Sequence, residues 1–281
     1  MSLREEAKRN LREHGIIPKK RLGQSFLVDK ESLHKMVACA SLCQEDVVLE
    51  IGAGLGFLTE RLAEIAGKVV AVEVDPRLTQ ILRNRLKDFA NVSLVEGDIL
   101  KIDVRGFNKV VSTPPYSISS PLLFWLLEKG FELSVLAFQE EFAQRLAAPV
   151  GSRDYGRLTV SVYCHAEVEL LDLIPKECFW PMPEVDSRIV RLRPKKPPFK
   201  VDNQGFFDEL VKAVFSQKNR KVRNALSPLL SRLGIPKTEA VEMADALPFC
   251  DRRPRELAPE EIGLLANEAL KVLRQRQRRK G

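Results

Sequence analysis

Four short apolar runs in the first half of the chain each end in a glycine or a polar residue, and this repetition constrains the fold more than any other feature. The residues at the four ends are Gly52, Glu73, Asp98 and Thr113. Helical patterns over residues 58–65 and 76–86 separate the first three runs. This alternation predicts an open α/β sheet, in which ligands bind outside the carboxyl ends of the strands. We therefore expect the four residues to meet in one crevice and to bind one nucleoside-like cofactor.

The first run, residues 47–51, ends in a glycine-rich turn with the sequence G-A-G-L-G. Gly52 and Gly54 allow the backbone to approach a ligand closely, and the N-terminus of the following helix points at that ligand. The third glycine comes one position too early for the dinucleotide pattern G-x-G-x-x-G. This spacing favours a cofactor smaller than a dinucleotide, although many α/β turns contain so short a pattern.

Acidic residues end the second and third runs. Glu73 follows the glycines at about the 20-residue spacing at which a carboxylate accepts hydrogen bonds from a ribose diol. An ordinary solvated acid at a strand end is the alternative. Asp98 is placed to accept a hydrogen bond from the amino group of an adenine.

The fourth run leads into a proline-rich turn, S-T-P-P-Y-S-I-S-S-P, before a helical stretch. Its chemistry fits methylation of an exocyclic amine. The side-chain oxygen of Thr113 and the carbonyl of Pro114 would accept hydrogen bonds from the amine, which makes its nitrogen more electron-rich. Pro115 stiffens the turn, since its φ is fixed, and Tyr116 offers a flat face for a base. The alternative is an ordinary proline-rich turn with a buried tyrosine.

The middle of the chain contains residues 158–163, 168–174 and 189–192, which are predicted to be strands, and a loop rich in proline and aromatic residues. In that loop, Phe179 or Trp180 is a candidate for the second wall of a base pocket, opposite Tyr116. The alternative is that these rings pack in the hydrophobic core, and we expect at least one of the two to do so. Near the start, Lys19-Lys20-Arg21 and the segment that follows suit a flap over a bound ligand or a helix connector.

A charged, proline-rich stretch, R-P-K-K-P-P at 193–198, predicts a boundary between a domain at 1–193 and a domain at 199–281 that contains helical patterns only. The net charge of +7 is concentrated in basic residues at both ends of the chain. Lys218, Arg220, Lys221 and Arg223 form a candidate phosphate-contacting cluster. These features favour a nucleic-acid partner over a merely solvated basic surface or an exposed helix junction.

The five cysteines are scattered and contain no C-x-x-C pair, and there are only three histidines. A metal site is therefore not expected, and the composition suits reduced thiols in a cytoplasmic protein. No apolar run approaches the ~20 residues of a membrane span. The charged N-terminus does not have the features of a signal peptide.

Several motifs in order make the chain resemble the ribosomal RNA adenine N6,N6-dimethyltransferases of the KsgA type, and more distantly the Erm type. They are G-Q-S-F-L, E-I-G-A-G-L-G-F-L-T, V-E-V-D, E-G-D, T-P-P-Y, F-W-P-M-P-E-V-D-S, F-S-Q-K-N-R-K-V-R-N-A-L and R-P-R-E-L. The segment D-Y-G-R-L-T-V-S-V is similar to the archaeal branch. The resemblance implies a Rossmann-like class I methyltransferase sheet with a smaller C-terminal all-α domain that binds rRNA.

The resemblance also implies S-adenosylmethionine as the cofactor. Ser25, Leu27 and Gly54 would line its site, Gly52 would meet the methionine end, Glu73 the ribose, and Asp98 the adenine, with Thr113 close by. Thr113 and Pro114 would hold the target amine, while Tyr116 and Phe179 would sandwich the target base. The implied substrate is a pair of adjacent adenines in a hairpin near the 3′ end of small-subunit rRNA. The partner would be the immature small subunit, bound by a monomer.

Three positions depart from the family pattern: Thr113 and Pro114 in the proline-rich turn, and Ser25. The turn is usually N-L-P-Y, so Thr113 keeps an acceptor oxygen but loses the reach of an amide. Ser25 stands where asparagine or histidine is usual. The expected reaction is direct transfer of the methyl group to N6 of an unstacked base, with no metal or covalent nucleophile. Two alternatives stay open: a DNA adenine N6 methyltransferase, or an rRNA-binding assembly factor that barely catalyses.

Overall fold

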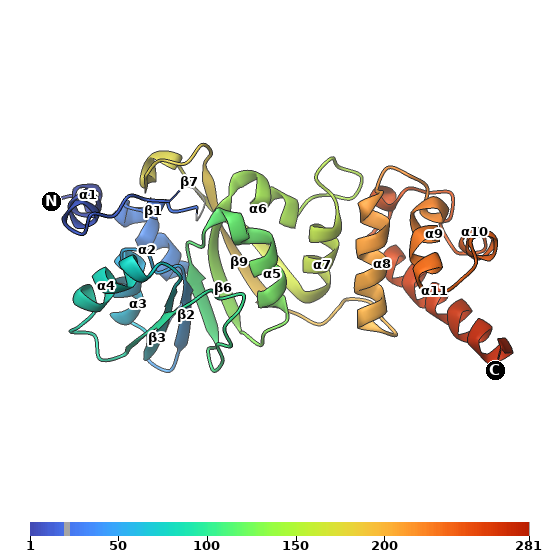
Figure 1. Ribbon diagram of the computed structural model, residues 1–281, viewed down its shortest axis with the longest axis horizontal. Helices are drawn as coiled ribbons and strands as arrows, with labels where there is room; N and C mark the ends of the chain where they lie inside the picture. The colour runs from blue at the N-terminus through green and yellow to red at the C-terminus, as the bar shows by residue number, and fades with distance from the viewer. Residues whose placement is uncertain (20–22, 281) are drawn as a thin grey trace. The chain divides into compact units, whose positions relative to one another are not determined.

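The computed structural model describes residues 1–19 and 23–280, and the chain divides into two compact units (Figure 1). The first unit comprises residues 1–143 and 167–194, and the second comprises residues 144–166 and 195–281. The first is built on a β-sheet and the second is helical. This composition confirms the predicted α/β fold with a smaller all-α part.

The first unit contains a seven-stranded sheet in the order β4-β3-β2-β5-β6-β9-β7. The strands are β2 (Val47–Ile51), β3 (Lys68–Glu73), β4 (Val92–Glu96), β5 (Lys109–Ser112), β6 (Leu133–Gln139), β7 (Ala166–Ile174) and β9 (Ser187–Pro194). The neighbours from β4 through β6 pair in parallel, whereas β9 is antiparallel to β6. The carboxyl ends of β2 to β5 therefore all lie at one edge of the sheet.

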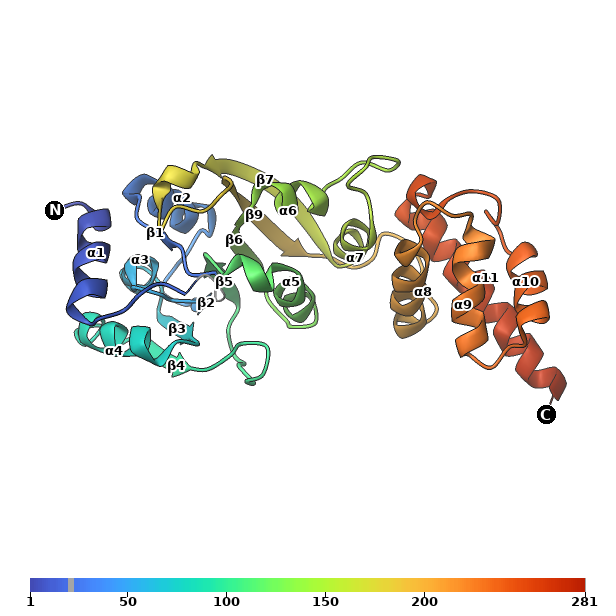
Figure 2. The same cartoon turned by 45° about the horizontal axis from the view of Figure 1, so that its top comes forward.

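Both faces of the central strands β2, β3, β5 and β6 are buried, which explains why these strands read as apolar runs. The helices of the unit are α1 (Leu3–Glu13), α2 (Lys30–Cys39), α3 (Phe57–Ala63), α4 (Pro76–Arg85) and α5 (Ser119–Leu127) (Figure 2). The helix α6 (Glu140–Leu146) begins in this unit and ends in the helical one. Val48 and Val69 belong to a core cluster that also contains Met36 of α2 and Leu62 of α3. A separate cluster joins Ala71 of β3 to residues of α4.

A two-stranded antiparallel ribbon completes the first unit. Its strands are β1 (Phe26–Leu27) and β8 (Phe179–Trp180), which pair Phe26 with Trp180 and Leu27 with Phe179. The ribbon joins the N-terminal segment to the aromatic loop between β7 and β9. It was not predicted, because two-residue strands leave no periodic pattern in a sequence.

The second unit packs five helices around its own core. They are α7 (Arg157–His165), α8 (Gln204–Ser216), α9 (Val222–Arg232), α10 (Lys237–Asp245) and α11 (Pro259–Lys280). The prediction of a strand at 158–163 is wrong, since this segment lies within α7. Its alternating pattern fits either structure over so short a run, and packing against α8 decides in favour of the helix.

The helical unit also differs in extent from the predicted domain at 199–281. Residues 144–166 belong to it, because Tyr155 and Cys164 are buried in the same core cluster as Phe207 of α8 and Leu257. The Tyr155 hydroxyl donates a hydrogen bond of 2.7 Å to the carbonyl of Leu257. The linker at 193–198 still contains the point where the chain leaves the sheet unit for good. Among the described residues, no helix is both long and apolar enough to cross a membrane.

Candidate active site

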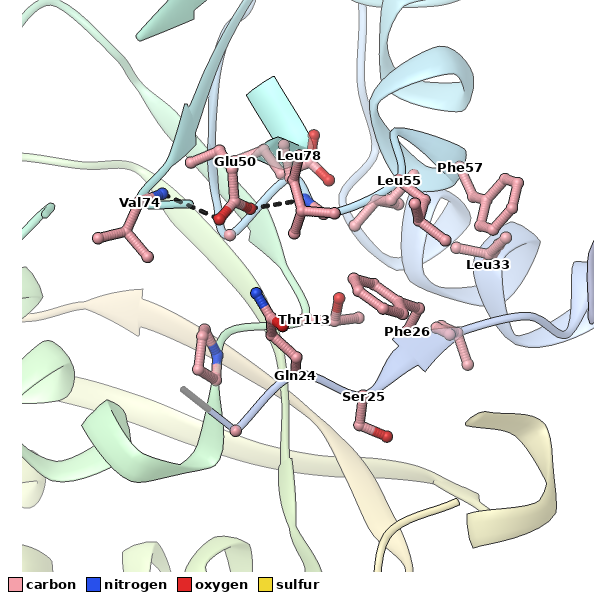
Figure 3. Close-up of a pocket in the computed structure, with 18 residues that line it drawn as sticks. Gln24, Ser25, Phe26, Leu33, Glu50, Leu55, Phe57, Val74, Leu78 and Thr113 are labelled. Carbon is pink, nitrogen blue, oxygen red and sulfur yellow. Dashed lines mark hydrogen bonds between the residues drawn. The ribbon is translucent and has the colours of Figure 1, made fainter. Parts of the chain in front are cut away.

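The four strand ends singled out in the sequence line two adjoining pockets at one edge of the sheet. One pocket is lined by Gly52, Glu73 and Thr113, among others (Figure 3). A second pocket is lined by Gly52, Glu73 and Asp98, among others. The two pockets share the wall formed by Gly52, Glu73, Val74 and Pro115. The structure therefore brings all four residues together around one elongated space.

The glycine-rich turn after β2 uses the freedom of its glycines at two positions. Gly52 and Gly54 have φ angles of 79° and 60°, in the left-handed region that disfavours other residues. A Cβ on Gly54 would lie 2.9 Å from Cδ1 of Phe26, and one on Gly52 would lie 3.1 Å from Cδ of Pro115. The turn is therefore in close contact with both the N-terminal segment and the proline-rich turn.

Glu73 holds the glycine-rich turn in place. Its carboxylate accepts hydrogen bonds from the backbone N–H groups of Gly54 (2.8 Å), Val74 (2.9 Å) and Asp75 (2.9 Å). Burial raises the pKa of Glu73, while these three N–H groups act in the opposite direction. A carboxylate has about four acceptor positions, so one remains for a ligand hydroxyl.

Glu50, in the middle of the apolar run of β2, is a site residue that sequence reasoning missed. It lines the first pocket and is 1% exposed, and its Oε2 atom is buried without a hydrogen-bond partner among the described residues. Burial raises the pKa of Glu50 to about 8. The Thr59 hydroxyl acts in the opposite direction, and the charge of Glu73 adds to the increase. The signal in the sequence was a carboxylate within an otherwise buried strand, where an unpaired charge is costly.

The proline-rich turn begins next to Ser112, whose side chain is held by a hydrogen bond. At the end of β5, the Ser112 hydroxyl donates a 2.5 Å hydrogen bond to the carbonyl of Ile51, which ties the turn to the glycine-rich turn. Thr113 faces the first pocket, and its hydroxyl has no hydrogen-bond partner among the described residues. That oxygen is thus available to a ligand. Pro114 is buried and is not among the lining residues of either pocket.

The two predicted base-stacking rings are neighbours, but they are not arranged as a sandwich. The ring centroids of Tyr116 and Phe179 lie 6.5 Å apart with an interplanar angle of 68°, so the rings meet edge to face. Phe179 is only 1% exposed and belongs to the core cluster. A base inserted between two rings needs parallel faces about 7 Å apart, twice the stacking separation of close-packed carbon atoms. Phe179 is therefore a core residue, which is the alternative role given for one of the two rings, and Trp180 is partly exposed.

The N-terminal segment forms part of the lining of the first pocket. Ser25 and Leu27 are among the lining residues, and the Ser25 hydroxyl donates to the carbonyl of Pro181 at 2.5 Å. Lys20 and Arg21 of the predicted flap lie outside the described residues.

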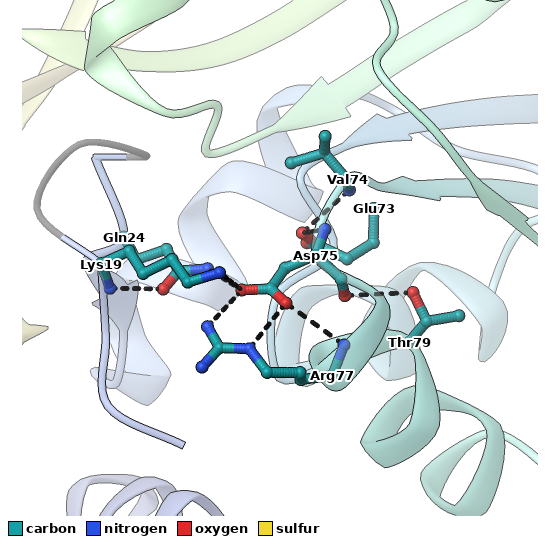
Figure 4. A network of polar contacts seen from close by, with 7 residues as sticks. All are labelled: Lys19, Gln24, Glu73, Val74, Asp75, Arg77 and Thr79. Carbon is teal, nitrogen blue, oxygen red and sulfur yellow. Dashed lines mark hydrogen bonds and ion pairs between the residues drawn. The ribbon is translucent and has the colours of Figure 1, made fainter.

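A polar network anchors this segment to the start of α4 (Figure 4). Nε2 of Gln24 donates to the buried carboxylate of Asp75 at 3.0 Å, and Oε1 of Gln24 accepts from the backbone N–H of Lys19 at 2.7 Å. Arg77 forms an ion pair of 2.6 Å with the same carboxylate. Hydrogen bonds from Arg77, and one from Gln24, lower the pKa of Asp75, so this carboxylate stays charged at neutral pH.

Replacing Gln24 by alanine is expected to weaken binding of the cofactor that the sequence implies about tenfold, because a hydrogen bond to a charged group is worth about 1.5–3 kcal/mol. The loss should appear as faster dissociation, since the segment lines the pocket. Stopped-flow displacement of a fluorescent cofactor analogue measures that rate. Gln44→Ala is the matched control, because Gln44 donates to the carbonyl of Ile65 away from the pocket. Equal rates in the two variants would contradict the role of the anchor.

The basic cluster of the helical unit is largely paired within the unit. Lys221 and Arg223 both form ion pairs with Asp251, and Lys218 donates to the carbonyl of Arg153 at 2.6 Å. Arg220 is exposed and has no ion-pair partner among the described residues. Of the four predicted phosphate contacts, Arg220 is therefore the one most available to an anion.

Comparisons with known proteins give these features a context. Residues 17–247 match the protein family described as "Ribosomal RNA adenine dimethylase". The chain is 46% identical, over 87% of its length and 91% of the relative's, to a probable ribosomal RNA small subunit methyltransferase A of Methanosarcina acetivorans. It is 42% identical, over 89% of both chains, to the protein of the same description in Thermococcus kodakarensis.

Two solved structures are similar over nearly the full chain. A dimethyladenosine transferase from Plasmodium falciparum superposes with a TM-score of 0.74 and 28% identity, covering 89% of this chain and 97% of that one. The 23S rRNA methyltransferase ErmE superposes with a TM-score of 0.66 and 28% identity, covering 87% and 99%. Both likenesses extend beyond the sheet-based unit.

Proposed function

This chain belongs to the ribosomal RNA adenine dimethylase family, and on that premise we propose that it transfers methyl groups from S-adenosylmethionine to N6 of two adjacent adenines. The adenines lie in a 3′-terminal hairpin of small-subunit rRNA, and the product is dimethyladenosine. The convergence of Gly52, Glu73, Asp98 and Thr113 on adjoining pockets carries this proposal within the structure. A methyl donor and an amine acceptor have to meet in such a space.

The residues present fit S-adenosylmethionine. Gly52 and Gly54 line the first pocket, and the unpartnered oxygen of Glu50 suits the ammonium of the methionine end. Glu73 has an acceptor position left for the ribose, and Asp98 lines the second pocket, where an adenine amino group can donate to it. When bound, the cofactor supplies a methyl group activated by a positively charged sulfur.

The proline-rich turn prepares the acceptor nitrogen. The lone pair of an adenine N6 is delocalised into the ring, so it is a poor nucleophile. The Thr113 hydroxyl and the Pro114 carbonyl accept hydrogen bonds from the amine, which keeps the lone pair on nitrogen and aims it at the methyl group. The ring of Tyr116 supports the face of the base. The base must first leave the stack of neighbouring RNA bases, at a cost of a few kcal/mol. The alkylated amine then releases its proton to water, so no strong base is needed.

Alignment is the main contribution of the protein to the rate. Holding two reactants in a near-attack geometry supplies up to about 7–11 kcal/mol of the barrier in ideal cases. The tie between Ser112 and Ile51 serves this purpose, because it fixes the proline-rich turn relative to the glycine-rich turn.

The helical unit contributes to binding of the RNA. Its basic residues attract phosphates independently of sequence, and Arg220 is exposed for such a contact. The protein acts in the cytoplasm, as a monomer bound to the immature small subunit.

Purified protein with labelled S-adenosylmethionine is expected to methylate immature small subunits in a single turnover, and mass spectrometry should find dimethyladenosine in their rRNA. Incorporation into duplex DNA but not into rRNA would instead identify a DNA adenine methyltransferase. Tight rRNA binding without methyl transfer would identify an assembly factor. Either of these results would overturn the proposal.

A further inference from the structure

The hydroxyl of Tyr116 has a buried partner on a distant part of the chain. Its Oη atom lies 2.5 Å from Oγ of Ser187, the first residue of β9. Ser187 is fully buried, whereas Tyr116 is half-buried and directly follows Pro115, which lines both pockets. A buried hydroxyl without a partner is costly, so this pair satisfies two groups at once.

Ser187 is held by the sheet and not by the proline-rich turn. It pairs with Gln139 in the antiparallel ladder between β6 and β9. The preceding carbonyl, of Asp186, accepts from the N–H of Glu140 at 3.0 Å. The next side chain, Arg188, donates to Glu140 at 2.6 Å. Ser187 is therefore a rigid anchor, fixed on both sides.

Tyr116 itself lies in a short 3₁₀ turn, Tyr116–Ile118, directly after the T-P-P segment. Stacking on a base uses only the face of an aromatic ring, and a phenylalanine provides that face equally well. The hydroxyl needs another explanation. Its bond to Ser187 attaches the far end of the ring to the sheet, so the ring is fixed at both its backbone end and its hydroxyl end.

We propose that Ser187 is a positioning residue that sets the orientation of the Tyr116 ring, and through it the alignment of the target base. This inference rests on the proposed function, since it assigns the ring to the target adenine. A ring held at two points presents its face before the base arrives, so less alignment is lost to motion. Burial raises the pKa of Tyr116, so the hydroxyl keeps its proton and the bond persists at neutral pH.

The test compares Tyr116→Phe, Ser187→Ala and the double variant in single-turnover methylation of immature small subunits. Each single variant should slow the methyl-transfer step about tenfold, while the dissociation constant of S-adenosylmethionine stays within about twofold of the wild-type value. The double variant should be no slower than either single variant, because both remove the same bond. Ser187→Thr, which keeps a hydroxyl, should recover most of the rate.

Ser134→Ala is the matched control. Ser134 is a fully buried serine of β6 whose hydroxyl has no hydrogen-bond partner among the described residues. Its removal should leave the rate unchanged. Normal rates in both single variants, or losses that multiply in the double variant, would overturn the positioning role. A change in Tm without a change in rate would overturn it as well, since it would show a purely structural bond.

Failure of the proposed function can be told apart from failure of this inference. Wild-type protein that does not methylate rRNA would refute the function. The bond is also tested without substrate, by thermal unfolding of the wild type, Tyr116→Phe, Ser187→Ala and the double variant. If the change in Tm of the double variant equals the sum of the changes in the two single variants, the two hydroxyls are not coupled. That result would overturn the bond between Tyr116 and Ser187 as the basis of the inference.

Discussion

Thr113→Val is expected to lower the rate of methyl transfer about 100-fold, the magnitude typical of removing one preorganised hydrogen-bonding group at a reacting centre. Valine has nearly the shape of threonine but cannot accept the hydrogen bond from the adenine amine. Thr113 lines the first pocket, and its hydroxyl is free of protein partners among the described residues. Binding of S-adenosylmethionine should therefore weaken by no more than about threefold. Single-turnover kinetics and equilibrium dialysis separate the two quantities.

Two further substitutions at this position sharpen the result. Thr113→Ser keeps the hydroxyl and should retain most of the rate. Thr113→Asn restores the amide typical of the family, and no gain in rate would show that the threonine is harmless or compensated. A Thr113→Val enzyme as fast as the wild type would refute the assignment of the Thr113 hydroxyl as an acceptor.

The affinity for S-adenosylmethionine is expected to increase with pH between about pH 5.5 and pH 7, by as much as tenfold per unit, because Glu50 must lose a proton to pair with the ammonium. The pKa of Glu50 in the protein is about 8, so the group is neutral over most of this range. A ligand cation stabilises the ionised form, and binding then releases the proton. The upper limit avoids titration of the ligand's own α-amino group, whose pKa is about 7.7–8.0.

5′-Methylthioadenosine is the matched control ligand. It keeps the adenine and ribose of the cofactor but lacks the amino-acid end, so its affinity should not follow the titration of Glu50. The same pH dependence for both ligands would assign the proton to Glu73, whose pKa is also raised. In Glu50→Gln the pH dependence for S-adenosylmethionine should disappear, and calorimetry in buffers of different ionisation enthalpy should detect no released proton.

The same titration makes a prediction about stability. Between pH 4.5 and pH 8 the folded protein holds a proton on Glu50 that the unfolded chain has lost. The free energy of unfolding should therefore fall as pH increases through this window, by up to about 1.4 kcal/mol per unit. In Glu50→Gln this contribution is absent, so the variant should gain stability relative to the wild type at pH 8 and not at pH 4. Denaturant titrations at the two pH values measure the difference.

Much of this site could be predicted from the sequence, because its residues occupy the ends of strands. A parallel strand directs its carboxyl end to one edge of the sheet, so apolar runs that end in Gly52, Glu73, Asp98 and Thr113 already specify neighbours. The linker and the helical patterns likewise indicated a second unit. These features follow from local periodicity, which needs no knowledge of distant contacts.

Other features could not be predicted, since they depend on what each segment packs against. The alternating segment at 158–163 forms a helix because the core around α8 buries it. Phe179 and Trp180 are adjacent in sequence and comparable in hydrophobicity, yet only the ladder with β1 decides which of them is buried.

The sequence by itself determined the order of the strand ends and the residue types found there. The periodicity of a strand and the spacing of a turn are properties of consecutive residues. The tertiary structure alone decided the state of Glu50, whose pKa rises because surrounding elements exclude water from it. It also decided the pairing of Tyr116 with Ser187 and the anchoring of Gln24 by Asp75. Burial and long-range hydrogen bonds are set by residues far apart in the chain, so they exist only once the sheet has brought those residues together.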